Sequence, residues 1–373
     1  MRLAFVLFTW FPHGGLQQDL VKVVRACQQR GATGISIYCM AWEGEALGGV
    51  DTIVVPARGW SATARRADFA RYIATQVAGN FDRIIGFNRL PGLDYYYAAD
   101  LCFAAKARGQ RGFFYRLLPR TRQYLAMESA VFGPEARTIA LLLSPMQRAQ
   151  YKQYYATPDA RLLDVPPGIR REHCAGPDAA ELRQSFRAEY GIADDALVVL
   201  QVGSSFRTKG VARSLIALAT LPSDLKGRVR YFLVGRDDPR PWLERAEAVG
   251  LGAQVNIIGA LGGIPRFMQG ADLLLHPSLA ESAGMVLLEA VVAGLPVLTT
   301  ASCGYAFHVE RAQAGLVCPE PFSQDVLNLA LVSMLQADRS AWRANGIRYG
   351  REHNLYDMPQ AVAQIVMGDG GAR

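Results

Sequence analysis

The sequence lacks features that several classes of protein require. No run of 18 or more apolar residues occurs, so no transmembrane helix is predicted. The six cysteines are scattered without a CxxC pair, which favours reduced core thiols in a cytosolic protein. The apolar N-terminus has neither a charged n-region nor a small-residue cleavage site. We therefore expect it to form a first buried strand and not a signal peptide.

Length, apolar content and charge limit the number of domains and the kind of partner. The chain has 373 residues, and half of them are apolar, which suffices for two to three domains with large cores. The formal net charge is +7. That excess favours an anionic partner such as nucleic acid, a membrane surface or phosphate groups.

Apolar strand-like runs alternate with helical patterns along almost the whole chain, which predicts parallel α/β layers. The expected strands are residues 2–8, 35–40, 52–55, 83–87, 95–99, 138–143 and 161–165, then 197–202, 229–234, 255–258, 273–276 and 297–299. The Pro-Pro-Gly sequence at 166–168 separates the two series and is the best linker candidate. We therefore predict an N-terminal domain, residues 1–166, and a C-terminal domain, residues 167–354.

Residues 276–300 contain the strongest candidate site: a strand, a small-residue turn, an apolar helix and a second strand. Glu281 and Glu289 lie in these apolar surroundings, and a buried charge needs a partner or a ligand. The turn lets a ligand approach the backbone, and the helix N-terminus offers unpaired amides to an anion. The residues concerned are Ala283, Gly284, Met285 and Val286.

The order of these groups suits a sugar, a diphosphate and a ribose. The first carboxylate would bind sugar hydroxyls, the amides would bind phosphate, and the second carboxylate would bind more hydroxyls. The alternative is a buried strand–helix–strand unit in which the second glutamate is incidental.

A second loop adds positive charge at the end of a strand. The sequence GSSFRTKG, residues 203–210, follows the strand at 197–202 and carries Arg207 and Lys209. A leaving diphosphate gains negative charge as its bond to the sugar breaks, and fixed cations act where that charge develops. The alternative for Lys209 is an ordinary surface loop.

The first domain offers polar residues near predicted strand ends. Gly15 follows the first strand, but no GxGxxG pattern is present, which argues against a dinucleotide oxidoreductase. Asn88 follows the strand at 83–87, where open α/β sheets bind ligands, and Asp100 follows the strand at 95–99. Asp19 lies in the following helix, where a solvated first-turn acid is the alternative.

The spacing of the two glutamates, followed by Ala-Gly-Leu-Pro-Val, resembles the retaining nucleotide-sugar glycosyltransferases of family 4. FPHGGLQQDL, GFNRLPGLDYYYAAD, LLDVPPGI, QVGSSFRTKGVARSL and other segments resemble the lipopolysaccharide core glucosyltransferase I of Gram-negative bacteria. The resemblance implies the α/β GT-B fold, with two Rossmann-like domains whose parallel sheets face a central cleft. It also implies that a C-terminal helix, about residues 355–373, packs back on the first domain.

The same resemblance implies an activity. It is the transfer of α-glucose from UDP-glucose to an inner-core heptose, with retention and with neither a metal nor another cofactor. Departures such as ESAGM at 281–285 keep galactose and N-acetylglucosamine donors open. The two glutamates are too far apart along the chain to suit a hydrolase, and no nucleophile stands out, so we expect front-face attack. A sugar-nucleotide epimerase and a non-catalytic UDP-sugar binder are the rival classes.

The resemblance also implies roles for individual residues. Glu281, Lys209, Asp100 and Asp19 form the expected catalytic group, with Glu281 on sugar hydroxyls. The expected donor-binding residues add Gly15, Gly203, Arg207, Ala260, Ile264, the turn residues Ala283 to Val286, and Glu289 on the ribose. Asn88, Asp100 and His173 form the expected acceptor side.

Residues 101–127 combine cations with aromatic side chains and contain no Asp or Glu. We name this the basic–aromatic segment. Its cations are Lys106, Arg108, Arg111, Arg116, Arg120 and Arg122. This composition suits an anionic membrane surface, at about 1 kcal/mol per cation. The resemblance implies the same placement: a cytoplasmic protein, peripheral on the inner face of the membrane, with a lipid-linked oligosaccharide acceptor. A solvated basic helix is the alternative, and RNA is disfavoured because no RNA-reading motif is present.

Overall fold

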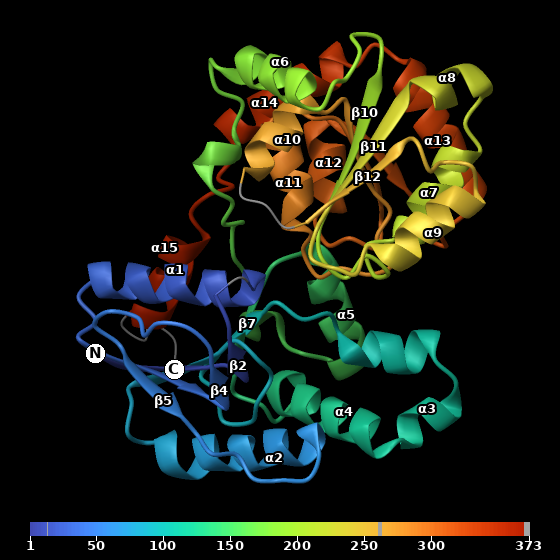
Figure 1. Ribbon diagram of the computed structural model, residues 1–373. Coiled ribbons are helices and arrows are strands. Elements are labelled where there is room, and N and C mark those ends of the chain that lie inside the picture. Colours follow the sequence, from blue (N-terminus) through green and yellow to red (C-terminus); the bar gives the residue numbers. More distant parts are fainter. Residues whose placement is uncertain (13, 260–262, 369–373) are drawn as a thin grey trace. The chain divides into compact units, whose positions relative to one another are not determined.

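The computed structural model describes residues 1–12, 14–259 and 263–368 (Figure 1). The chain forms two compact units. Unit 1 contains Met1–Gly168 and the C-terminal segment that begins at Asp357, and unit 2 is Ile169–Tyr356. The first junction directly follows Gly168, the last residue of the Pro-Pro-Gly sequence. In the described ranges, no helix combines the length and the apolar content needed to cross a bilayer.

Unit 1 is built on a parallel sheet of seven strands in the order β5-β3-β1-β6-β7-β8-β9. Its strands are β1 (Arg2–Val6), β3 (Gly34–Cys39), β5 (Asp51–Val54), β6 (Arg83–Gly86), β7 (Tyr95–Ala98), β8 (Ile139–Leu142) and β9 (Leu162–Asp164). The strand order reverses between β1 and β6. Ligands of open α/β sheets bind beyond the carboxyl ends at such a point. A separate two-stranded pair joins β2 (Thr9–Trp10) to β4 (Ala41–Trp42).

Helices cover the sheet of unit 1. They are α1 (Gly15–Gln29), α2 (Ala62–Tyr72), α3 (Phe113–Leu117), α4 (Pro119–Phe132), α5 (Pro145–Tyr155) and α15 (Met358–Met367), with the short π-helices η1 (Ile73–Val77) and η2 (Ala105–Gln110) and the 3-10 helix η3 (Asp159–Arg161). Helix α1 buries Leu20, Val23, Val24 and Cys27, whose helical spacing places them on one face. Helix α15 packs against α1 inside unit 1. The amide of Met358 donates to Pro167 O at 3.1 Å, which anchors the start of α15.

Unit 2 contains a second parallel sheet, in the order β12-β11-β10-β13-β14-β15. Its strands are β10 (Leu197–Val202), β11 (Val229–Val234), β12 (Val255–Ile258), β13 (Leu273–His276), β14 (Val297–Thr300) and β15 (Gly315–Cys318). The reversal of strand order falls between β10 and β13. Strand β15 was not predicted, because its four residues are only partly buried and lie at the sheet edge.

Helices lie on both faces of this second sheet (Figure 1). They are α6 (Ala179–Glu189), α7 (Val211–Ala219), α8 (Ser223–Arg228), α9 (Arg240–Ala248), α10 (Ile264–Gly270), α11 (Met285–Val292), α12 (Ala306–Ala312), α13 (Gln324–Gln336) and α14 (Ser340–Glu352), with the turn η4 (Arg171–His173). One apolar core joins the sheet to α7, α8, α9 and α13. Two parallel sheets with flanking helices confirm the predicted α/β class.

Candidate functional site

The loop between β13 and α11 places Glu281 beside the strand-order reversal of unit 2. Its backbone is tied to the loop after β14. The Glu281 amide donates to Ser302 O at 3.1 Å, and the Gly304 amide donates to Glu281 O at 2.9 Å. These two bonds set the direction in which the Glu281 side chain leaves the backbone.

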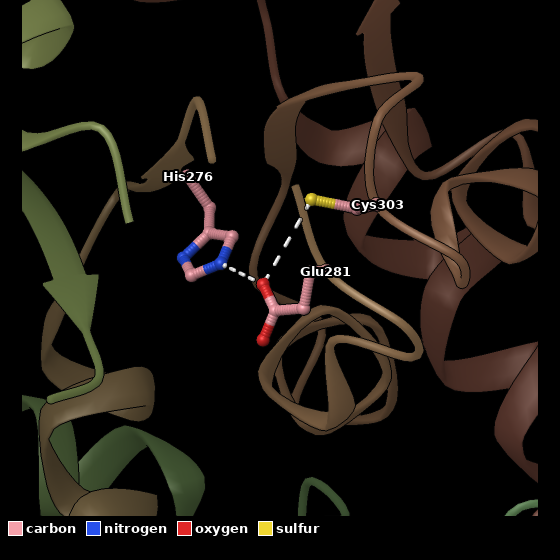
Figure 2. A group of neighbouring side chains, drawn as sticks. All are labelled: His276, Glu281 and Cys303. Atoms are coloured by element: carbon pink, nitrogen blue, oxygen red, sulfur yellow. Dashed lines mark hydrogen bonds and ion pairs between the residues drawn. The ribbon is translucent and has the colours of Figure 1, made fainter. Parts of the chain in front are cut away.

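Three groups surround the Glu281 carboxylate. The ammonium of Lys209 forms an ion pair with Oε1, and His276 Nε2 donates to Oε2 at 2.9 Å. The thiol of Cys303 lies 3.9 Å from Oε2 (Figure 2). Burial opposes ionisation of Glu281, but the contacts with His276 and Lys209 outweigh it and lower its pKa to about 2. The carboxylate is therefore charged and held in one orientation at neutral pH.

The lowered pKa of Glu281 predicts a pH dependence of stability. A carboxyl group whose pKa falls on folding stabilises the protein above its unfolded-state pKa, near 4.5, and loses that contribution as pH falls toward 2. We expect the difference in free energy of unfolding between wild type and Glu281→Gln to be constant above about pH 5 and to shrink below it. Urea titrations between pH 7 and pH 3 measure this difference. A gap that stays constant down to pH 3 would contradict the prediction.

The loop at 203–210 carries Lys209 to this carboxylate. Gly210 has φ +75°, and an added Cβ would lie 2.0 Å from Pro277 O, so only glycine fits this approach of the two loops. The Leu279 amide donates to Thr208 O at 2.8 Å, and Gln201 Nε2 donates to Lys209 O at 2.6 Å. These two bonds fix the backbone at Thr208 and Lys209.

The other predicted donor residues take different positions. Arg207 is exposed on the same loop, and Gly203 adopts φ +139° next to the Lys209 side chain. Gly284, at φ +90°, starts α11, so Met285 and Val286 form its first turn as predicted. Ile264 is the first residue of α10, and the predicted position Ala260 lies outside the described residues.

Glu289, one of the two predicted donor carboxylates, has a histidine neighbour. Oε1 of Glu289 lies 3.7 Å from Nε2 of His173, which belongs to η4. The sequence analysis grouped His173 with the acceptor residues. His173 lies against the predicted ribose carboxylate because η4 packs against α11 inside unit 2, and its acceptor role stays a prediction.

In unit 1, Asp19 is not the solvated acid that the sequence left as an alternative. Its side chain is 16% exposed, and Lys22 lies 3.2 Å away. The Tyr97 hydroxyl donates to its carboxylate at 3.0 Å. Burial raises the pKa of Asp19 above its ordinary value, against the opposing effect of Lys22. Gly15 begins the same helix, with open space beside its Cα.

Asn88 and Asp100 follow two neighbouring strands, β6 and β7. The Asn88 side-chain oxygen accepts the Phe8 amide at 2.7 Å, so it holds the chain just after β1. Asp100 is 44% exposed, lies 3.6 Å from Arg89 and accepts from the Tyr96 hydroxyl at 3.2 Å. Asp100 is thus partly open to solvent.

Arg89, which contacts Asp100, also belongs to a buried ion pair. Arg89 pairs with Glu128, whose side chain is fully buried. The Glu128 carboxylate also accepts the amides of Phe103 and Ala104, at 2.7 and 2.8 Å, and the Tyr155 hydroxyl at 2.8 Å. These bonds fix the start of the basic–aromatic segment to the core of unit 1.

About half of the described residues in the basic–aromatic segment are exposed to solvent. Four large apolar side chains, Phe113, Phe114, Leu117 and Leu118, are between 51% and 81% exposed. The predicted membrane cations Lys106, Arg108, Arg111, Arg120 and Arg122 are exposed, and Arg116 is half-buried. Several of these cations stack on neighbouring rings, among them Arg116 at 5.0 Å from the Phe113 ring. A helix with a buried apolar face does not account for these exposed apolar residues.

Sequence and structure comparisons relate the chain to known proteins. Residues 183–353 match the family model for glycosyl transferases group 1. The chain is 39% identical to the lipopolysaccharide glucosyltransferase WaaG of Escherichia coli K12 over 371 residues, 99% of each sequence. The chain belongs to the group 1 glycosyltransferases.

The structural likeness of this glycosyltransferase to solved structures extends over both units. The crystal structure of WaaG, a glycosyltransferase involved in lipopolysaccharide biosynthesis, matches 98% of this chain with a TM-score of 0.90, covering 100% of that chain. Anabaena Alr3699/HepE in complex with UDP-glucose matches with a TM-score of 0.71 at 18% identity, over 98% of this chain and 99% of that one. The second match shows the fold alone. The predicted GT-B fold class is confirmed.

Sequence reasoning missed several residues of this glycosyltransferase that contact the candidate groups. His276 and Cys303 touch Glu281, and Arg89 and Glu128 hold Asp100 and the segment after it. His276 ends a predicted strand directly before the candidate loop, which was an available signal. Arg89 and Glu128 are separated by 39 residues, so no local pattern connects them.

Proposed function

We propose that this glycosyltransferase moves α-glucose from UDP-glucose to an inner-core heptose of lipopolysaccharide, with retention of configuration. The observation that carries the proposal is the ion pair between Lys209 and Glu281 at adjacent strand ends. The 39% identity to a lipopolysaccharide glucosyltransferase over nearly the whole chain supports the choice of donor and acceptor.

Lys209 and Glu281 would each bind a different part of the donor. Lys209 would stabilise the diphosphate, whose negative charge grows as the glycosidic bond breaks. Glu281 would accept hydrogen bonds from the glucose hydroxyls, because its charged carboxylate is already oriented by His276. Glu289 would accept from the ribose hydroxyls.

Retention would follow from attack on the same face that the diphosphate leaves. The acceptor hydroxyl oxygen forms the new bond to the anomeric carbon as the bond to the phosphate oxygen breaks, and the hydroxyl proton passes to that leaving oxygen. Asp100 and Asp19 would orient the acceptor. No carboxylate of the protein becomes glycosylated in this sequence of events.

The reaction is proposed to need no metal. One ligating atom each from His276, Glu281 and Cys303 lies within 4.8 Å of the others, a spacing that a metal ion could bridge. Lys209 already brings a positive charge to the same carboxylate. Burial raises the pKa of the Cys303 thiol to about 11, which disfavours the thiolate that binds metals. The group therefore suits an ammonium better than a metal ion.

We accordingly expect full activity without divalent metal. Dialysis against EDTA, followed by assay in its presence, should leave the initial rate within about twofold of the untreated rate. Addition of Zn²⁺ or Mg²⁺ after dialysis provides the comparison. A tenfold loss that metal restores would contradict the proposal and favour the three-residue group as a cation site.

The acceptor is proposed to be lipid-linked and presented at the inner face of the cytoplasmic membrane. Exposed cations beside exposed aromatic and leucine side chains support this placement, since such residues bind anionic lipid surfaces. The protein would then be cytoplasmic and peripheral on that membrane.

The deciding experiment offers heptose-terminated core lipid with UDP-glucose, UDP-galactose or UDP-N-acetylglucosamine in separate reactions. Mass spectrometry of the lipid reads the product, and NMR of the new anomeric proton reads the configuration. We expect one hexose added, from UDP-glucose only, in the α configuration. Transfer from another donor would change the donor assignment, and no transfer despite UDP binding would overturn the proposed activity.

A further inference from the structure

One tryptophan of unit 1 is fully exposed and does not pack in a hydrophobic core. Trp60 is 105% exposed, as exposed as a free side chain, in the loop before α2. The loop is well defined by its neighbours: the Ser61 hydroxyl accepts the Ala64 amide at 3.0 Å and caps α2. A fully exposed tryptophan at a fixed position is unusual, since large apolar side chains gain free energy by leaving water.

Hydrogen bonds join the start of α2, next to Trp60, to α4. Gln123 Nε2 donates to Thr63 O at 2.7 Å. The Arg66 guanidinium donates to the Tyr124 hydroxyl and stacks on the Tyr124 ring, 5.5 Å from its centroid. Trp60 therefore lies close to the first half of α4, which directly follows the exposed residues of α3.

Beyond these contacts, α2 and α4 leave a shallow trench between them. Its volume is about 340 Å³. The lining is mostly alanine: Ala67, Ala70, Ala74, Ala126 and Ala130, with Met127, Pro91, Gln123 and Arg71. Among the lining residues, Ala67, Arg71, Ala74 and Ala126 are exposed. The trench thus extends the apolar surface away from Trp60 along both helices.

Charge around this surface is almost all positive. Helix α2 carries Arg65, Arg66 and Arg71 and a single acid, Asp68, which Arg71 pairs at 2.9 Å. The acid of α4, Glu128, is fully buried. An apolar surface surrounded by cations fits the headgroup and upper acyl region of an anionic bilayer, where tryptophan is also favoured.

We propose that the Trp60 loop is a second membrane anchor, inserted into an anionic phospholipid bilayer next to the basic–aromatic segment. Trp60 would lie at the headgroup boundary, and lipid acyl chains would cover the trench between α2 and α4. The inference rests on the proposed membrane placement and deepens it, because it names a second contact outside residues 101–127.

Tryptophan fluorescence tests the proposal directly. We expect the emission of wild type to shift to shorter wavelength on mixing with phosphatidylglycerol vesicles, and not with phosphatidylcholine vesicles. Trp60→Phe should lose this shift while Trp342→Phe, a matched change in α14 of unit 2, retains it. In sedimentation with the same vesicles, Trp60→Ala should bind about tenfold more weakly than wild type.

The outcomes distinguish failure of the proposed membrane placement from failure of the proposed Trp60 anchor. If wild type does not bind anionic vesicles, the membrane placement itself fails, and this inference fails with it. If wild type binds but Trp60→Phe keeps the full shift, the membrane placement stands and the second anchor is overturned. A shift that rises with protein concentration without vesicles, with a dimer in light scattering that Trp60→Ala abolishes, would assign Trp60 to a second copy of the chain and overturn the proposal. Equal melting temperatures for wild type and Trp60→Ala would show that binding, and not folding, has changed.

Discussion

Glu281→Gln is expected to lower kcat/KM for hexosyl transfer by about 10²–10³-fold, with UDP binding within about threefold of wild type. The glutamine amide keeps the size of the side chain but has no negative charge. It therefore cannot form the ion pair with Lys209, and it replaces the carboxylate that accepts the hydrogen bond from His276. The sugar would lose its charged acceptor, whereas Lys209 keeps its charge for the diphosphate and the predicted ribose contact at Glu289 is untouched. Initial rates with UDP-glucose and calorimetric titration with UDP measure the two quantities.

Glu244→Gln is the matched control for this change. Glu244 is an exposed residue of α9 in the same unit, so its substitution should leave both quantities unchanged. If Glu281→Gln transferred hexose at more than a tenth of the wild-type rate, Glu281 would not have the proposed donor role. Equal loss of UDP and UDP-glucose binding would point to a collapsed loop instead.

Glu128→Ala is expected to destabilise the protein by about 3–5 kcal/mol, the largest stability effect we predict. The substitution leaves the Arg89 charge without its buried partner and the amides of Phe103 and Ala104 without their acceptor. Chemical denaturation measured by circular dichroism gives this difference. Because the same bonds fix the residues after Asp100, we also expect activity to fall in the folded fraction.

Two variants test the physical reason for that loss. Arg89→Met combined with Glu128→Leu removes both charges, and replacing a buried ion pair by apolar residues should recover much of the lost stability. Glu135→Ala, at an exposed position after α4, should change stability by less than about 0.5 kcal/mol. A loss below 1 kcal/mol in Glu128→Ala would show that the carboxylate is not the partner on which this region depends.

Local sequence patterns were sufficient for much of the fold. Alternating strands and helices and the start of α11 at Gly284 depend on residues that are neighbours in the chain. The exposed edge strand β15 escaped this reasoning because its burial is incomplete.

The sequence by itself determined the alternation of elements and singled out Glu281 and Lys209 as functional candidates. Only the tertiary structure decided that these two residues, 72 positions apart, form an ion pair, because β10 and β13 are neighbours in the sheet. The same holds for the pair of Arg89 and Glu128 and for the exposure of Trp60. Periodicity reports which face of an element is buried, whereas the order of strands in a sheet sets which distant side chains meet.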